Sequence, residues 1–270
     1  MTLTTRPSTE ASRLTPLPAA SVDGIEIHAS SSGSGPRTVI LVHGWTCDET
    51  TWESQIPALA KDYRVLTIDL PGHGKSDAPK DGNLSMDLFA RAVESVRLDS
   101  QAKRVVLIGH SMGTPVIVHY ARLYPKNVAA MVFADGLVTI PPSWPFARLL
   151  GLTLALSAVR RATIRSMFSA ATTPEMRERI LRMMMSAPTA TAVGAMKATF
   201  DRTNWKGDVF TQPVLALYAD RSPYAKRDAM TRRFPNMEFV EIAGTGHFLM
   251  LEKPDEFNRL LLEFLARQTF

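Results

Sequence analysis

The sequence predicts an α/β protein in which a mostly parallel sheet is flanked by helices and interrupted by a helical cap insertion. Three observations lead to this prediction: continuous β-branched runs, an alternation of strand and helix patterns, and one long helical stretch that breaks the alternation. The chain has 270 residues, of which 45% are hydrophobic. A chain of this size and composition can bury one substantial core.

Continuous apolar runs mark the strands that we expect to be buried on both faces. In the first half of the chain these runs are Thr38–His43, Arg64–Asp69, Arg104–Gly109 and Val128–Ala134. Helical patterns separate them at Trp52–Ala60, Leu84–Leu98 and Met112–Leu123. Strands and helices that alternate in this way predict a parallel sheet with helices on its faces.

The segment before the first buried run has a different pattern. Val22–Ala29 alternates apolar and polar residues around an Asp23-Gly24 turn, and a Ser/Gly-rich turn follows at Ser30–Pro36. Together they predict a short antiparallel entry to the sheet. Residues 1–20 lack the continuous apolar stretch of a signal peptide, so we expect a flexible N-terminal arm there.

The alternation stops after Asp135, where prolines break the chain, and residues 146–200 have helical patterns throughout. Thr173-Pro174 is a typical helix start, with a capping hydroxyl and a proline at the first position. The alternation then resumes with the segments Val214–Tyr218, Tyr224–Phe234, Glu238–Ile242 and Pro254–Ala266. We therefore predict a core formed by residues 21–136 and 207–270, with a helical cap at residues 137–206.

Charge and cysteine content narrow the classes of function. The net charge is +5, but the 31 basic and 26 acidic residues are mixed along the chain, so nucleic-acid binding is not expected. The single cysteine, Cys47, excludes an internal disulfide and a four-cysteine zinc site. No apolar run is long enough to span a membrane. We expect a cytoplasmic protein that is a monomer or a homodimer and acts on a small molecule.

The strongest motif is Gly109-His110-Ser111-Met112-Gly113, which follows a buried strand and opens a helix. The turn from strand to helix is so tight that the flanking positions have no room for a Cβ, and the serine hydroxyl is left exposed above the sheet. The N-terminus of the helix offers unpaired N–H groups to a developing oxyanion. The motif predicts that Ser111 is a nucleophile and that the N–H of Met112 is an oxyanion donor.

Two further loops follow buried strands. The first is His43-Gly44-Trp45, where the N–H of Trp45 is the expected second oxyanion donor and His43 is expected to hold the loop. The second is Gly244–Phe248, which carries His247 near the C-terminus of the chain. A serine hydroxyl needs an adjacent base at neutral pH, and His247 fits this role best by its context.

With these motifs in this order, residues 22–268 resemble the α/β-hydrolase superfamily. The matching segments are His43-Gly44-Trp45, Asp69–Ser76, Gly109–Gly113 and Gly246-His247-Phe248. Within the superfamily the chain looks like the compact, capped serine esterases, in which a cap commonly follows the fourth buried strand.

The resemblance leaves two candidates for the acid of the triad. The family usually places it in the loop after Val214–Tyr218, but the usual position falls on Ser222, and Asp220 lies two residues earlier. Asp135 ends the strand that follows the nucleophile's own strand, and some members take their acid from there. We favour Asp135 and keep Asp220 as the alternative.

The predicted reaction is hydrolysis of small, largely apolar carboxylic esters through an acyl-enzyme. No cofactor and no metal is expected, because no histidine pair has ligand spacing. The resemblance also permits a lactonase, an amidase, a carbon–carbon bond hydrolase or a perhydrolase. It disfavours dehalogenase and epoxide-hydrolase chemistry, because those relatives carry an aspartate where Ser111 stands. A non-catalytic receptor that binds a small molecule under the cap is the alternative from another class.

Overall fold

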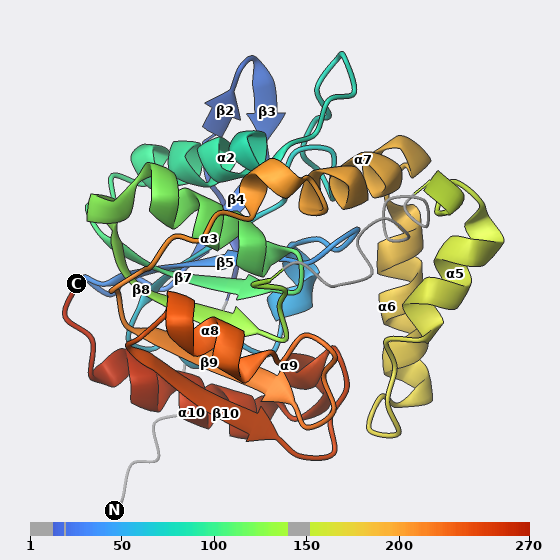
Figure 1. The fold of residues 1–270 in the computed structure, drawn as a ribbon. Coiled ribbons are helices and arrows are strands. Elements are labelled where there is room, and N and C mark those ends of the chain that lie inside the picture. Colours follow the sequence, from blue (N-terminus) through green and yellow to red (C-terminus); the bar gives the residue numbers. More distant parts are fainter. Residues whose placement is uncertain (1–12, 19, 140–151) are drawn as a thin grey trace, which may run out of the picture.

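A computed structural model of the chain describes residues 13–18, 20–139 and 152–270 (Figure 1). These residues form an eight-stranded sheet in the order β1-β4-β6-β5-β7-β8-β9-β10, and a separate hairpin of β2 and β3. The strands of the sheet are β1 (Thr15–Pro16), β4 (Ala29–Ser32), β5 (Thr38–Val42), β6 (Arg64–Ile68), β7 (Val105–His110), β8 (Val128–Ala134), β9 (Val214–Ala219) and β10 (Met237–Ile242). The hairpin consists of β2 (Ala20–Val22) and β3 (Ile25–Ile27).

The pairing confirms the predicted fold, because the six neighbouring strands β6, β5, β7, β8, β9 and β10 are parallel to one another. At one side of this sheet, β4 pairs antiparallel with β6 and with β1. Every residue of β5, β7, β8 and β9 is buried, as expected for strands that are covered on both faces.

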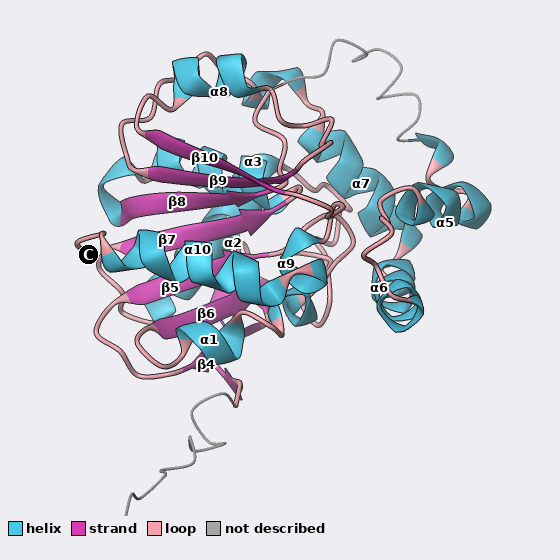
Figure 2. Ribbon diagram, turned by 90° about the horizontal axis from the view of Figure 1, so that it is seen from below, coloured by secondary structure: helices cyan, strands magenta, loops and turns pink. Residues whose placement is uncertain are grey.

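Helices cover both faces of the sheet. In the described residues the α-helices are α1 (Ile56–Leu59), α2 (Met86–Asp99), α3 (Gly113–Leu123), α5 (Ser157–Arg165), α6 (Pro174–Ser186), α7 (Thr189–Thr199), α8 (Arg227–Arg233), α9 (Leu249–Glu252) and α10 (Pro254–Ala266). Short 3₁₀ helices lie at Glu49–Trp52, Pro125–Asn127 and Arg202–Asn204. Helices α2 and α3 lie on one face of the sheet, and α1 and α10 lie on the other (Figures 1 and 2).

Helices α5, α6 and α7 come from the chain between β8 and β9, and they lie together on the side toward which the strands of the sheet point (Figure 1). Helix α6 begins as its sequence predicts, since the Thr173 hydroxyl accepts the N–H of Met176 and Pro174 opens the helix. No helix in the described part of the chain is long and apolar enough to cross a membrane.

Two local expectations differ from the structure. The helix predicted at Trp52–Ala60 is instead the 3₁₀ turn Glu49–Trp52 followed by α1, because Pro57 has no N–H with which to continue an earlier helix. The turn predicted at Ser30–Pro36 is shorter, since β4 runs to Ser32 and pairs with the edge of β6. The hydrogen bonds between β4 and β6 satisfy backbone groups that would otherwise stay unpaired. This gain outweighs the preference of the serines in this segment for a turn.

The flexible arm predicted at residues 1–20 also needs correction. Residues 1–12 and 19 lie outside the described part of the chain. Within it, Thr15 and Pro16 form β1 against β4, and the N–H of Leu17 donates to the carbonyl of Ala29 at 2.9 Å. Leu17 also packs against the core, so this end of the segment is an edge strand and not a free arm.

Candidate active site

Ser111 lies on the sharp turn between β7 and α3. Its φ is +52°, in the left-handed region that side chains rarely adopt, and its N–H donates to the carbonyl of Ala134 at 3.0 Å. A Cβ on Gly109 would lie 2.6 Å from the backbone of Gly113, and a Cβ on Gly113 would overlap the carbonyl of Val42. Both glycines are therefore required by close backbone approach, and they hold the turn that presents Ser111.

His247 joins Ser111 to Asp135. Its Nε2 lies 2.8 Å from Ser111 Oγ, and its Nδ1 lies 2.6 Å from Asp135 Oδ2. Only 8% of His247 and 2% of Asp135 are exposed. A carboxylate can only accept, so Nδ1 carries the proton of that bond, and Nε2 is left to accept the proton of the serine hydroxyl.

The loop after β8 fixes Asp135 firmly. Its φ is +46°, its N–H donates to the carbonyl of Leu217, and its Oδ1 accepts the N–H of Ala219. The next residue, Gly136, has no room for a Cβ because the side chain of Thr114 fills that position. Asp135 is therefore held by the end of β9 as well as by its own strand.

The alternative acid, Asp220, lies just beyond the end of β9. It is exposed to solvent, and no hydrogen bond joins it to His247. Ser222, at the usual acid position of the family, accepts the N–H of Tyr224 and takes no part in this chain of contacts. Of the two aspartates, the structure brings only Asp135 to the histidine.

Trp45 and Met112 lie on the two loops that flank Ser111. Within the described residues, no group accepts a hydrogen bond from the backbone N–H of either residue. A Cβ on Gly44 would lie 3.0 Å from Ser111 Cβ, so the Trp45 loop runs directly beside the serine. Thr46, with a φ of +55°, turns the chain after Trp45, and its hydroxyl donates to the Trp45 carbonyl at 2.8 Å. The two N–H groups are therefore available to a ligand at Ser111.

Backbone strain is concentrated at this site. The non-glycine residues with a left-handed φ in the described part of the chain are Asp23, Thr46, Gln101, Ser111 and Asp135. Three of these five belong to the loops just described. Such conformations cost about 1–3 kcal/mol each and persist where the surrounding structure imposes them, as at active sites.

The other buried histidines of the region support the loops. His43 Nδ1 donates to the carbonyl of Gly44 at 2.8 Å, and its Nε2 accepts the N–H of Leu70 at 3.0 Å. Burial also lowers the pKa values of these histidines. The pKa of His43 is lowered, that of His73 falls to about 3, and that of His110 lies well below its usual value. These imidazoles are therefore neutral at physiological pH.

Cys47, which follows the Trp45 loop, is a buried thiol. Burial raises its pKa to about 12, so the reactive thiolate is not populated near neutral pH. Of Cys47 and Ser111, only Ser111 has a histidine nitrogen hydrogen-bonded to its nucleophilic atom.

A second polar cluster lies beside the site. Ligand atoms of His28, Glu49 and Asp69 come within 4.8 Å of one another, a spacing that a metal ion would accept. However, Lys75 Nζ donates to Glu49 Oε1 at 3.0 Å, and Asp69 accepts the backbone N–H groups of Glu49 and Lys75. The ammonium group of Lys75 therefore already supplies a positive charge to this cluster. Through Asp69, the cluster also connects the loop after β6 to the loop after β5.

The sequence did not identify two residues that touch the His247 loop. Tyr224 lies with its ring 5.4 Å from the His247 ring, and Glu252 accepts the N–H of Gly246. Glu252 also binds Ser169 and Thr172, which lie 83 and 80 residues away. No spacing in the sequence signals a contact between positions so far apart.

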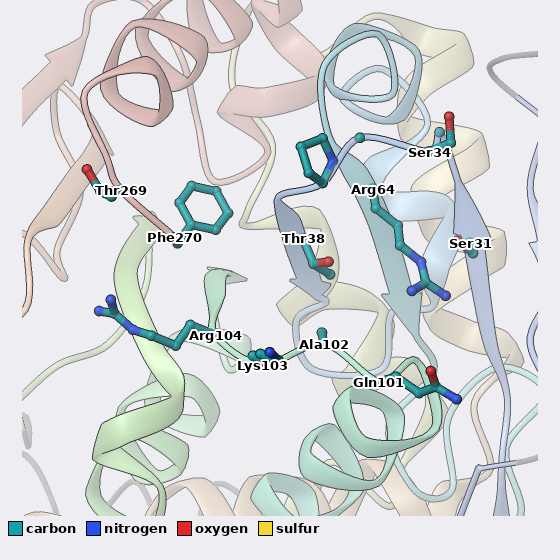
Figure 3. Close-up of a pocket in the computed structure, with 13 residues that line it drawn as sticks. Ser31, Ser34, Thr38, Arg64, Gln101, Ala102, Lys103, Arg104, Thr269 and Phe270 are labelled. Carbon is teal, nitrogen blue, oxygen red and sulfur yellow. The ribbon is translucent and has the colours of Figure 1, made fainter.

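The cavity in Figure 3 lies at the opposite edge of the sheet. It has a volume of about 920 Å³ and is lined by residues that include Thr38, Arg64 and Arg104, at the beginnings of β5, β6 and β7. Ser111 and His247 lie beyond the other ends of the strands, so this cavity is separate from the candidate active site.

The comparisons with known proteins agree with this geometry. The sequence profile of the alpha/beta hydrolase fold family matches residues 37–254. A 2-hydroxy-6-oxononadienedioate/2-hydroxy-6-oxononatrienedioate hydrolase of Paraburkholderia phymatum is 26% identical, over 90% of this chain and 92% of its own. A hydrolase of the same name from Klebsiella pneumoniae is 28% identical over 90% and 92%. The structure of a thermophilic esterase from Thermogutta terrifontis superimposes with a TM-score of 0.83 and 26% identity, covering 94% of this chain and 98% of the esterase.

Proposed function

The chain belongs to the α/β-hydrolase fold family, and we propose that it is a serine hydrolase that cleaves small, largely apolar carboxylic esters through an acyl-enzyme. The observation that carries the proposal is the hydrogen-bonded chain from Ser111 through His247 to Asp135, with separations of 2.8 and 2.6 Å. Nucleophile, base and orienting acid within such distances are the requirement for activating a serine hydroxyl.

The first half of the reaction forms the acyl-enzyme. His247 Nε2 takes the hydroxyl proton as Ser111 Oγ attacks the ester carbonyl carbon, and the N–H groups of Trp45 and Met112 bind the resulting oxyanion. The imidazolium, stabilised by Asp135, then gives its proton to the leaving alkoxide as the carbon–oxygen bond breaks.

Water carries out the second half. His247 takes a proton from the water as its oxygen attacks the acyl carbon, and the same N–H groups hold the second oxyanion. The proton then returns to Ser111 Oγ as the carboxylic acid leaves, which restores the starting state.

The charges around the site favour an uncharged substrate. Among the described residues, no lysine or arginine donates a hydrogen bond to Ser111 or His247. The buried arginine of the described cap, Arg160, donates from its two Nη atoms to the carbonyls of Ala187 and Met185, while its Nε has no hydrogen-bond partner among the described residues. The described residues thus place no cation on the triad that could pair with a substrate carboxylate, which supports the choice of a neutral ester.

The cap also contributes apolar, adaptable side chains. Its partly buried methionines that pack against the core are Met167, Met176, Met183, Met185 and Met196. Methionine fills irregular space and accepts ligands of different shapes, which suits acyl chains of more than one length.

A carbon–carbon bond hydrolase is the second candidate, and the names of the relatives from Paraburkholderia phymatum and Klebsiella pneumoniae favour it. The same nucleophile, base and oxyanion donors serve both reactions. The substrate, rather than the triad, distinguishes them.

Turnover of p-nitrophenyl esters of increasing acyl length, beside turnover of 2-hydroxy-6-oxononadienedioate, tests the proposal. We expect ester hydrolysis that Ser111→Ala lowers by at least about 10³-fold. The exposed Ser21 provides a matched control, Ser21→Ala, that should leave turnover unchanged. If the protein cleaves the dienedioate in preference to the esters, carbon–carbon bond hydrolysis replaces ester hydrolysis as its function. Turnover that survives in Ser111→Ala would overturn both candidate functions, because both require this nucleophile.

A further inference from the structure

The carboxylate of Glu252 lies between the loop of His247 and the cap. Glu252 Oε2 accepts the N–H of Gly246, the residue directly before His247. Glu252 Oε1 accepts the hydroxyls of Ser169, at 3.1 Å, and Thr172. One side chain therefore joins the histidine loop to the cap segment between α5 and α6.

The same cap segment contacts the histidine loop directly. The backbone N–H of His247 donates to the carbonyl of Met167 at 3.3 Å. A Cβ on Gly246 would lie 2.8 Å from Ser169 Cβ, so the two backbones are in close contact and only glycine fits there. The position of His247 thus depends on residues that precede it by about 80 positions.

Both ends of this connection are held in place. On the cap side, Arg177 donates to the carbonyls of Ser169, at 2.7 Å, and Thr172, at 2.8 Å. On the core side, α9 carries Glu252, and the side chain of Gln55 donates to the carbonyl of Met250 in that helix at 2.8 Å. Glu252 therefore connects two segments that are already ordered.

Glu252 is also an unusual carboxylate. It is half-buried, and in the described residues no lysine, arginine or histidine forms an ion pair with it. All three of its donors are neutral groups, one on the histidine loop and two on the cap. Placing a carboxylate there without a counter-ion has an electrostatic cost that stability alone does not require.

We infer that Glu252 is a positioning residue: it seats the His247 loop against the cap and so keeps His247 in line with Ser111 and Asp135. The inference rests on the proposed function, because it assigns to the cap a share in placing the general base. Glu252 has no hydrogen bond to any of these three residues, so it acts through the backbone of the loop. Misplacing a catalytic group by about 1 Å can cost 10²-fold in rate, so the loss of this contact should appear in kcat more than in KM.

The experiment compares Glu252→Ala, Glu252→Gln and Thr172→Val with the parent. Turnover is normalised to active sites titrated with a fluorophosphonate, so that misfolded protein does not count. In ¹⁵N-labelled protein, the downfield N–H signal of His247 Nδ1 in its 2.6 Å bond to Asp135 reports the position of the ring without any substrate. Glu263→Gln, which removes an exposed carboxylate from α10, is the control.

We expect kcat per titrated site to fall by about 10- to 100-fold in Glu252→Ala with KM changed less than threefold, and the NMR signal to broaden or disappear. Glu252→Gln should recover part of the loss, because its amide oxygen can still accept the N–H of Gly246. Thr172→Val removes the hydroxyl that donates to Glu252 and accepts the N–H of Ser169, and it should lower kcat several-fold. Glu263→Gln should match the parent.

A kcat within twofold of the parent and an unchanged NMR signal in Glu252→Ala would overturn the inference. If Glu252→Ala does not fold, an unchanged kcat and signal in Thr172→Val would overturn it instead. Failure of the proposed function is a different result, namely turnover that survives in Ser111→Ala. The NMR signal tests the position of His247 whichever bond the protein cleaves.

Discussion

In the described residues, two histidine–carboxylate pairs have a nitrogen–oxygen separation below 3 Å, and only one of them has the geometry of a general base. His247 Nδ1 lies 2.6 Å from Asp135, and His28 Nε2 lies 2.9 Å from Glu49. Both carboxylates are buried, with 2% and 5% of the residue exposed. Burial and pairing alone therefore do not identify a catalytic pair.

The difference lies in the groups around each pair. The second ring nitrogen of His247 faces the hydroxyl of Ser111 at 2.8 Å. Glu49, in contrast, also accepts from Thr67 at 2.8 Å and from Lys75 at 3.0 Å, so its oxygens are fully used. The His247–Asp135 pair can act as a base because the second ring nitrogen of the histidine faces a nucleophile. The His28–Glu49 pair is a structural contact because several other donors bind the same carboxylate.

The backbone shows the same contrast. Ser111 and Asp135 both have a left-handed φ, whereas none of His28, Glu49 and Lys75 does. Strained residues are retained where function requires the geometry. We therefore expect substitutions in the first pair to affect turnover, and substitutions in the second to affect stability.

The largest effect should come from Asp135→Asn. Because the remaining oxygen accepts the N–H of Ala219, the new amide NH2 faces His247 Nδ1 as a donor and favours the wrong tautomer. We therefore expect kcat to fall by about 10³- to 10⁴-fold while the fold is retained. Ester turnover gives kcat, and thermal unfolding monitors the fold. A loss smaller than tenfold would remove Asp135 from the triad.

Glu49→Gln should have the opposite profile. It leaves Lys75 and His28 without their charged acceptor, which should lower the free energy of unfolding by about 2 kcal/mol at pH 7. Turnover per titrated site should stay within about threefold of the parent. Urea denaturation measures the stability, and a loss of turnover as large as that of Asp135→Asn would break the comparison.

The stability contributed by Glu49 should also depend on pH. Burial alone would raise the pKa of Glu49, but hydrogen bonds from His28, Thr67, Ser30 and Lys75 lower it from 4.5 to about 2. A carboxyl group with a lowered folded-state pKa stabilises fully above its unfolded value, and this stabilisation is lost as the pH falls toward about 2. The difference in unfolding free energy between parent and Glu49→Gln should therefore be constant above pH 5 and shrink between pH 4.5 and 2. A difference that grows over this range would contradict the assignment.

The smallest effect should come from Asp220→Asn. Asp220 is exposed and has no hydrogen bond to His247, so kcat and stability should both stay close to those of the parent. Measured in the same ester assay, a loss comparable to that of Asp135→Asn would show that the loop after β9 supplies the acid in solution.

Much of the core follows from local sequence. The strand predicted at Val128–Ala134 and the helix predicted at Pro254–Ala266 have the predicted bounds, because each is a complete apolar pattern with clear ends. The geometry around Ser111 also follows from its motif, since Gly109 and Gly113 leave the chain one way to turn. The strand, the helix and the motif are each readable from one short segment of sequence, although Gly113 also makes room for the carbonyl of Val42 on the neighbouring strand.

Other features depend on contacts between distant residues, and the sequence left them open or gave no signal for them. Asp135 and Asp220 both follow strands that end on the same side of the sheet, so the sequence favoured Asp135 without excluding Asp220. The structure shows that only the Asp135 carboxylate reaches His247. Likewise, the contact of Glu252 with Thr172 depends on how the cap packs on the core. Sequence patterns specify the strands, but they do not specify which strand ends meet in space.

The central claim is that Ser111 is a nucleophile activated by His247, and covalent labelling tests it most directly. Intact-mass analysis after reaction with a fluorophosphonate should show one adduct on the parent, mapped to Ser111 by peptide sequencing. Ser111→Ala should take up no label, and His247→Ala should react far more slowly than the parent. A folded parent that stays unlabelled, or an adduct on another residue, would contradict the account.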